Sequence, residues 1–262
     1  MSEFLKRILV ALIFGPVILA GLWLGEWFLF ALSVAVSFGL IVEFKRVTAI
    51  KLPLFEYCII FLLSVFWLLG VAIRYNLSTE LLISSVLILF LSELLFQKIN
   101  GSLERLSIAL FLFVYSGILL SSFVFVRHFG RFWAILPVAM VWTVDTFAYW
   151  GGSLMGKRKL APNVSPNKTI EGFFCGFLSG FVVGWIALRL YPEMNSLAVW
   201  FLAFIAGIVG QLGDLFESKL KRQFGIKDMS SLIPGHGGLW DRMDSLLWVY
   251  PLTWLMLVLL NI

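Results

Sequence analysis

Four aspartates lie inside or beside long apolar stretches of this sequence, where a charged side chain is costly. Asp145 and Asp214 stand within such stretches, and Asp241 and Asp244 come directly before the last one. A charge at the centre of a bilayer costs roughly 2.5–3.5 kcal/mol, and less near its surface, so acids in such positions usually line a polar cavity. We therefore expect the four carboxylates to meet in one polar layer.

The spacing of these acids indicates a metal site. Asp241 and Asp244 are three residues apart, as are Asp214 and Glu217, so each pair falls on one face of a helix. Two carboxylates held this close repel each other unless a proton or a cation lies between them. Hard oxygen ligands of this kind suit Mg²⁺, which also binds water and substrate phosphates. The alternative is that neighbouring Lys and Arg side chains neutralise the acids in salt bridges at the membrane surface.

The segment before Asp241 alternates cations with carboxylates around a glycine-rich turn. It contains Ser218–Arg222, Lys227 and the run Ile233–Gly238. Glycines let backbone N–H groups approach an anion closely, and Lys and Arg bind phosphate. Metal-binding carboxylates, a glycine turn and cations are together what phosphoryl or nucleotidyl transfer needs. Within the turn, His236 fits either a phosphate donor or a brace of the loop.

A second polar loop, 153–169, has a similar character. It ends in Lys168 and Thr169 at an expected helix start, where free N–H groups face an anion. The run Gly151–Lys157 imitates a phosphate-binding Walker A loop, but Arg158 stands where Ser or Thr should bind Mg²⁺ and no strand precedes it. We reject that motif. The alternative for the whole loop is a basic anchor on anionic lipid.

The elements that must position these residues are apolar helices. The chain is 61% hydrophobic and 13% charged, whereas a soluble domain has about 25% charged residues. We predict an all-α polytopic membrane protein with about nine transmembrane helices, since roughly 20 residues of helix cross a bilayer. The predicted spans are 8–25, 27–42, 54–73, 81–96, 108–126, 133–152, 170–190, 197–216 and 245–261.

The basic residues predict the orientation. Placing the N-terminus in the cytoplasm leaves only four of the 20 Lys and Arg residues on the outer side: Arg74, Arg127, Arg131 and Arg189. Since cytoplasmic loops carry the excess of Lys and Arg, we predict the N-terminus inside, the C-terminus outside and both long loops, 153–169 and 217–244, at the cytoplasmic side. The net charge of +5 is then explained by topology and lipid, and we expect no nucleic acid partner.

The sequence divides into two regions. Residues 1–130 form predicted spans one to five, a scaffold that faces lipid or a second copy of the chain. Residues 131–262 form predicted spans six to nine with both polar loops, and we expect the catalytic site there. Glycines recur every four residues along span seven, where small side chains let helix backbones touch. These glycines are Gly172, Gly176, Gly180 and Gly184.

The segment Ser218–Asp244 resembles the signature of the CTP:phosphatidate cytidylyltransferases, or CDP-diacylglycerol synthases. Asp145-Thr-Phe-Ala-Tyr149 and Leu160–Gly172 resemble the other cytoplasmic elements of that family, so the resemblance covers about 145–245. It implies a Mg²⁺-dependent reaction of CTP with phosphatidic acid that gives CDP-diacylglycerol and pyrophosphate. It also implies a multi-pass protein of the inner membrane, with its active site facing the cytoplasm and membrane lipids as partners. A second cation and a homodimer are left open.

The resemblance also implies roles for particular residues. The expected catalytic residues are Asp214, Lys227, Asp241 and Asp244, of which the three aspartates hold the metal. The expected substrate-binding residues are Asp145, Asn167, Lys168, Thr169, Glu171, Ser218, Lys219, Lys221, Arg222, His236, Gly237 and Arg242. Which cation contacts CTP and which contacts phosphatidate is left open.

Functions of other classes remain open as alternatives to cytidylyl transfer. A CTP-dependent polyprenol or phytol kinase is the nearest alternative among enzymes. An ion-coupled transporter would use the membrane acids as ion sites, but such sites lie near the midplane of the bilayer and these acids fall at one edge. A membrane scaffold would need the two loops only as anchors.

Overall fold

The computed structural model describes residues 15–73, 78–96, 98–230 and 237–262. These residues belong to two compact units. The first unit comprises Met1–Phe125 with Met229–Leu239, and the second comprises Val126–Asp228 with Trp240–Ile262. The chain therefore leaves the second unit after Asp228 and returns to it at Trp240.

The first unit is built from apolar helices that pack through small polar side chains. Ser64 Oγ lies 3.0 Å from Ser116 Oγ, and Trp67 Nε1 donates to Ser121 Oγ at 2.9 Å, which satisfies these groups away from water. The elements are the short helix Gly15–Leu24, α2 (Glu26–Val47), α3 (Leu54–Ala72), α4 (Ser78–Leu95), α5 (Ser102–Phe113), the π-helical turn η1 (Val114–Leu119) and α6 (Leu120–His128), which runs on into the second unit.

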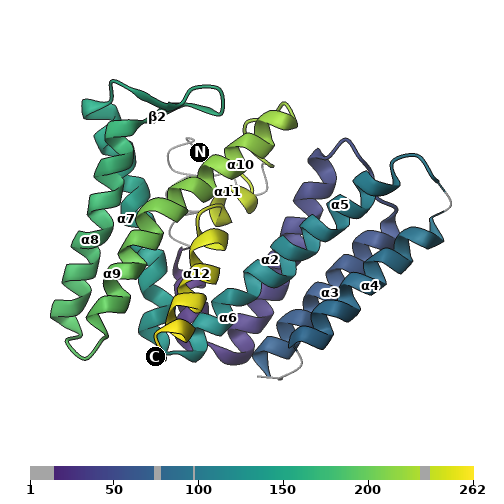
Figure 1. Cartoon of the computed structure of the whole chain (residues 1–262), viewed down its shortest axis with the longest axis horizontal. Helices are drawn as coiled ribbons and strands as arrows, with labels where there is room; N and C mark the ends of the chain where they lie inside the picture. The colour runs from purple at the N-terminus through teal and green to yellow at the C-terminus, as the bar shows by residue number, and fades with distance from the viewer. Residues whose placement is uncertain (1–14, 74–77, 97, 231–236) are drawn as a thin grey trace, which may run out of the picture. The chain divides into compact units, whose positions relative to one another are not determined.

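The second unit contains the remaining helices and a small hairpin. Figure 1 shows α8 lying along both α7 and α9. The elements are α7 (Arg131–Met155), β1 (Lys159–Ala161), β2 (Ser165–Thr169), α8 (Ile170–Leu190), α9 (Ser196–Ile205), the π-helical turn η2 (Ala206–Gly210), α10 (Gln211–Gln223), α11 (Trp240–Met243) and α12 (Leu246–Leu259).

The glycines of α8 lie against neighbouring helix backbones, which confirms the predicted packing. A Cβ atom on Gly172 would come within 2.5 Å of the carbonyl oxygen of Ala148, and one on Gly176 within 2.8 Å of the carbonyl oxygen of Val144. Only glycine permits this approach of α8 to α7. The second unit thereby gains close backbone packing, which stabilises helices in lipid.

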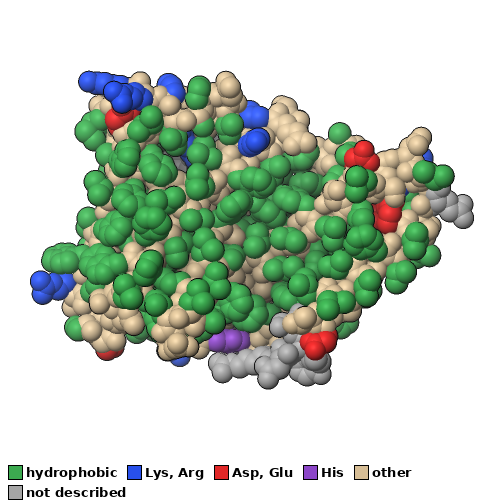
Figure 2. Space-filling view, in the orientation of Figure 1, with side chains coloured by type: hydrophobic (Ala, Val, Ile, Leu, Met, Phe, Trp, Pro, Cys, Tyr) green, Lys and Arg blue, Asp and Glu red, His purple; other side chains and the backbone are tan. Residues whose placement is uncertain are grey.

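Six continuous helices among the described residues are long and apolar enough to cross a membrane, so the chain is an integral membrane protein. In this count, α5, η1 and α6 form one helix (Ser102–His128), and α9, η2 and α10 form another (Ser196–Gln223). The predicted spans 8–25, 81–96 and 245–261 are not among the six. The described part of the first is the short helix Gly15–Leu24, and α12 has 14 residues. Nine spans and the cytoplasmic N-terminus stay predictions. Figure 2 shows hydrophobic side chains over most of the visible helix surface, with Lys and Arg side chains gathered near the hairpin.

The two polar loops have more regular structure than expected. The predicted loop 217–244 begins as a helix, because α10 continues to Gln223. The error has a physical reason: the charged residues of α10 share one face, so the helix runs on after the apolar stretch has ended. In loop 153–169, β1 and β2 pair antiparallel, with Lys159 opposite Thr169. This hairpin is the only sheet among the described residues of a chain that we expected to be all-α.

Candidate active site

Helix α10 presents a row of polar side chains along one face. Asp214, Glu217, Ser218 and Lys221 recur at helical spacing, and Ser218 Oγ lies 3.4 Å from Asp214 Oδ1. The π-helical turn η2 comes directly before this helix. The side chain of Gln211 fixes the junction, since its Nε2 donates to the carbonyl oxygens of Gly207 at 2.6 Å and of Phe173 at 3.1 Å. π-helical turns of this kind are frequent at functional sites.

Gly213 brings Asp244 close to Asp214. A Cβ atom on Gly213 would lie 2.8 Å from the carbonyl oxygen of Asp244, so α10 touches the backbone that leads into α12. The Asp244 carboxylate accepts a hydrogen bond from the N–H of Ser245 at 2.6 Å. Burial, together with the negative charge of Asp214, raises the pKa of Asp244 to about 6. A nearby cation would therefore stabilise the ionised form of the Asp244 carboxylate.

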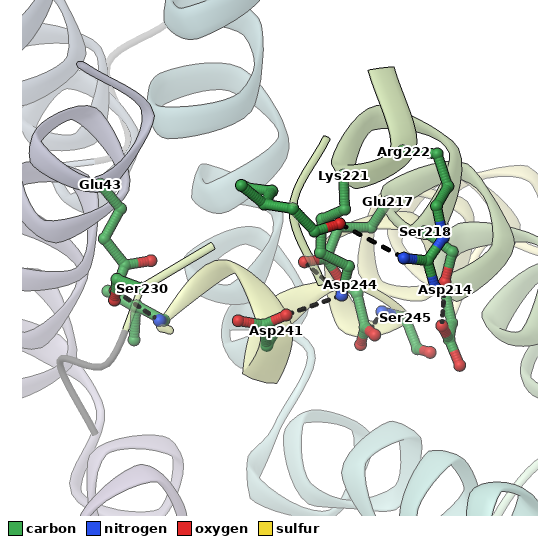
Figure 3. A network of polar contacts seen from close by, with 12 residues as sticks. Glu43, Asp214, Glu217, Ser218, Lys221, Arg222, Ser230, Asp241, Asp244 and Ser245 are labelled. Carbon is green, nitrogen blue, oxygen red and sulfur yellow. Dashed lines mark hydrogen bonds and ion pairs between the residues drawn. The ribbon is translucent and has the colours of Figure 1, made fainter. Parts of the chain in front are cut away.

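Lys221 joins two further acids (Figure 3). Its Nζ donates to Asp241 Oδ1 at 2.6 Å and lies 3.2 Å from Glu217 Oε1. Glu217 and Asp241 are both buried. One ammonium group therefore compensates two carboxylates that come from α10 and α11.

The hairpin supplies the second ammonium group. Lys168 on β2 forms an ion pair with Asp214, with 2.5 Å between Nζ and Oδ2. The next residue, Thr169, is the N-cap of α8, because its Oγ1 accepts from the N–H of Gly172 at 3.1 Å. The predicted helix start at Thr169 is therefore confirmed. The cap fixes the end of β2 and with it the position of Lys168.

Glu171 braces the base of the same hairpin. Its Oε2 accepts hydrogen bonds from the backbone N–H groups of Lys157 at 3.0 Å and Arg158 at 3.2 Å. Arg222 supports the tip from α10, where its Nε donates to the carbonyl oxygen of Val164 at 3.2 Å. These contacts tie the hairpin to the helices that carry the acids.

Asp145 and Arg242 complete the charged cluster. Asp145, on α7, lies within electrostatic range of Asp244, Asp214 and Lys168. Arg242 acts electrostatically on both Asp145 and Asp244. The acids that the sequence placed in one layer thus lie together within the second unit.

Comparison with known proteins gives the family of this chain. The profile of the cytidylyltransferase family matches residues 5–260. The chain belongs to this family. Three similar proteins are named phosphatidate cytidylyltransferase. The one from Staphylococcus haemolyticus is 40% identical over 186 residues, which cover 70% of each chain.

The other two relatives come from Staphylococcus epidermidis and Staphylococcus aureus. They are 39% and 40% identical to this cytidylyltransferase family member over 171 residues. Those residues cover 64% of this chain and 65% of the relatives, so the match spans about two thirds of their length.

The remaining predicted site residues of this family member are more exposed. Asn167, Lys219 and Lys227 have exposed side chains. Gly237 has a φ of 80°, the left-handed conformation that glycine was expected to provide in the turn. His236 lies outside the described residues.

The metal site stays a prediction. Among the described residues, no group of three or more His, Cys, Asp or Glu side chains could hold a metal ion. Two of the expected ligands instead pair with ammonium groups, Asp214 with Lys168 and Asp241 with Lys221. The donor chemistry fits Mg²⁺, because the acids are hard oxygen ligands and the buried Glu217 carboxylate shares its single ammonium partner, Lys221, with Asp241.

Glu217 was not among the individual site residues predicted from the sequence. It appeared only as part of the spacing from Asp214 to Ser218 on one helical face. Its burial between Lys221 and Asp241 was not visible from that spacing. The available signal was its position one helical turn after Asp214, on the face that carries the charge.

Proposed function

We propose that the protein transfers the cytidylyl group of CTP to phosphatidic acid, giving CDP-diacylglycerol and pyrophosphate. Membership of the cytidylyltransferase family and the printed name of the staphylococcal relatives support this assignment. The observation that carries it is the cluster in the second unit, where Asp214, Asp241 and Asp244 lie with two lysines. An apolar helical protein is also where a lipid substrate can reach such a cluster.

The reaction brings two polyanions together. A phosphate oxygen of phosphatidate attacks the α-phosphorus of CTP. The bond from that phosphorus to the oxygen that bridges to the β-phosphate breaks, and pyrophosphate leaves with the electron pair. Catalysis of this kind is mostly positioning and charge neutralisation. The ammonium groups of Lys168 and Lys221 and the guanidinium group of Arg242 supply positive charge for these phosphates.

The proposed cofactor is Mg²⁺, with Asp214, Asp241 and Asp244 as its ligands and Glu217 beside them. When bound, Mg²⁺ offsets negative charge on the phosphate oxygens and helps pyrophosphate to leave. Its carboxylate ligands would then no longer need the ammonium groups, since the metal compensates their charge. Lys168 and Lys221 would then be available to bind the substrate phosphates.

We place this site at the cytoplasmic surface of the inner membrane. CTP is a water-soluble anion and phosphatidate is a lipid, so the site must open to both phases. The distribution of Lys and Arg supports the cytoplasmic side.

The test uses purified protein, phosphatidate vesicles and CTP labelled either at the α-phosphate or at the γ-phosphate. We expect the α-label in the lipid product and the γ-label in pyrophosphate. Transfer of the γ-label to a lipid alcohol with release of CDP would indicate a CTP-dependent kinase and contradict the proposal. No transfer of either label would leave the transporter or scaffold interpretation.

A further inference from the structure

A buried carboxylate in the first unit lies against the segment that leads to Asp241. Glu43, near the end of α2, has none of its surface exposed. A carboxylate away from water needs hydrogen-bond donors, because its burial is otherwise strongly unfavourable. The donors of Glu43 come from the segment 229–239, which belongs to the same unit.

Glu43 binds both described ends of this segment (Figure 3). Its Oε1 accepts a hydrogen bond from Ser230 Oγ at 2.6 Å and another from the backbone N–H of Leu239 at 2.8 Å. Hydrogen bonds to an ionised acceptor are stronger than those between neutral groups. A single oxygen atom therefore accepts hydrogen bonds from both Ser230 and Leu239.

Two glycines make this contact possible. A Cβ atom on Gly238 would lie 2.7 Å from Glu43 Oε2 and 2.9 Å from Oε1, so the carboxylate rests directly on the glycine backbone. On α2, one turn before Glu43, a Cβ atom on Gly39 would lie 2.6 Å from Leu239 Cδ2. Gly39 and Glu43 share one helical face, which receives the side chain and the N–H group of Leu239 together.

We propose that Glu43 is a positioning residue for cytidylyl transfer, which holds the backbone of Gly238 and Leu239 where the chain leads into Asp241. Leu239 is joined through a single residue, Trp240, to Asp241, and the segment includes the left-handed Gly237 of the proposed phosphate turn. Glu43 therefore fixes the backbone N–H group of Leu239, two residues before Asp241 in the chain. This inference rests on the proposed function, and it assigns an enzymatic role to the N-terminal region that the sequence left as scaffold.

The test compares Glu43→Ala and Glu43→Gln with the wild type. Hydrogen exchange of a peptide covering 237–243 reports the anchor without any activity. In Glu43→Ala we expect exchange there to rise and kcat to fall, each by about tenfold to a hundredfold, the factor that a lost buried hydrogen bond corresponds to. Glu43→Gln keeps a carbonyl oxygen that accepts both hydrogen bonds, so it should recover most of the protection and most of kcat.

Two further variants make the result decisive. Glu104→Ala, at an exposed acid of the first unit, should leave both readouts unchanged. Gly238→Ala keeps Glu43 but forces its carboxylate away, and it should repeat the Glu43→Ala result if that variant fails to fold. The inference would be overturned if Glu43→Ala lowered kcat but left hydrogen exchange of the 237–243 peptide unchanged. It would also be overturned if Glu43→Ala raised that exchange but kept the kcat of the wild type. An inactive wild type would refute the proposed function, while the exchange data would still test the anchor.

Discussion

Lys168 and Asp214 form an ion pair with 2.5 Å between Nζ and Oδ2, and this pair connects the hairpin to α10. Lys168 lies in the hairpin that precedes α8, and Asp214 lies in α10, which follows α9 and η2. Both side chains are only partly exposed, so water does not fully solvate either charge. In the proposed function, a substrate phosphate replaces the carboxylate as the partner of the lysine.

Replacing Lys168 should therefore slow the reaction. Lys168→Met removes the ammonium group with little change in side-chain length, and we expect kcat to fall by about 10²–10³-fold, the usual effect of losing one charge-stabilising donor. Steady-state assays of purified protein measure this. Lys159→Met is the matched control, because Lys159 is exposed on β1 and should be dispensable. A Lys168→Met enzyme as fast as the control would mean that the ion pair is only structural.

Much of this arrangement was predictable from local spacing. The acids at Asp241 and Asp244, the helix start at Thr169 and the glycines of α8 depend on neighbours within one or two helical turns, and the structure confirms the helix start and the glycine packing. Apolar blocks likewise predict membrane helices, because the length of a span is fixed by the bilayer.

The remaining features depend on contacts between distant parts of the chain. The ion pair between Lys168 and Asp214 and the hydrogen bonds of Glu43 require knowledge of which helices pack together. The sequence prediction also began a loop at residue 217, because it followed apolar content. The helix continues to Gln223, where an amphipathic face replaces the apolar stretch.

The packing of α8 can be tested by overfilling its contact with α7. Gly176→Leu places a large side chain where a Cβ atom would already lie 2.8 Å from the carbonyl oxygen of Val144. Overpacking costs about 1–3 kcal/mol or more, so the melting temperature in detergent should fall by several degrees. Leu178→Ala, at a position 61% exposed on the same helix, should change it little. Equal melting temperatures for Gly176→Leu and the wild type would mean that this face of α8 does not pack as described.

The predicted orientation can be tested by labelling single cysteines in a variant that lacks Cys58 and Cys175. Lys159→Cys lies in the hairpin, on the predicted cytoplasmic side, and Glu193→Cys lies between α8 and α9, on the predicted outer side. An impermeant thiol reagent added to intact cells should label only position 193. Labelling of position 159 under those conditions would reverse the topology.

Removal of divalent metal should stop the reaction. Carboxylates clustered around Asp214 and Asp244 need a cation to remain ionised beside a polyanionic substrate. We expect a chelator to lower the rate by orders of magnitude and added Mg²⁺ to restore it, measured as pyrophosphate release. A full rate in the presence of excess chelator is the result that excludes Mg²⁺.

The most direct test of the central claim is the cytidylyltransferase activity of Asp244→Asn. The claim is that the acids of the second unit hold the metal on which the transfer depends, and asparagine keeps the shape of Asp244 while weakening it as a ligand. We predict that kcat with CTP and phosphatidate falls by orders of magnitude while the protein still inserts into the membrane. Asp228→Asn, in an exposed part of the chain, should cost much less. An Asp244→Asn enzyme that keeps most of its activity at low Mg²⁺ would contradict the account and make the cluster structural.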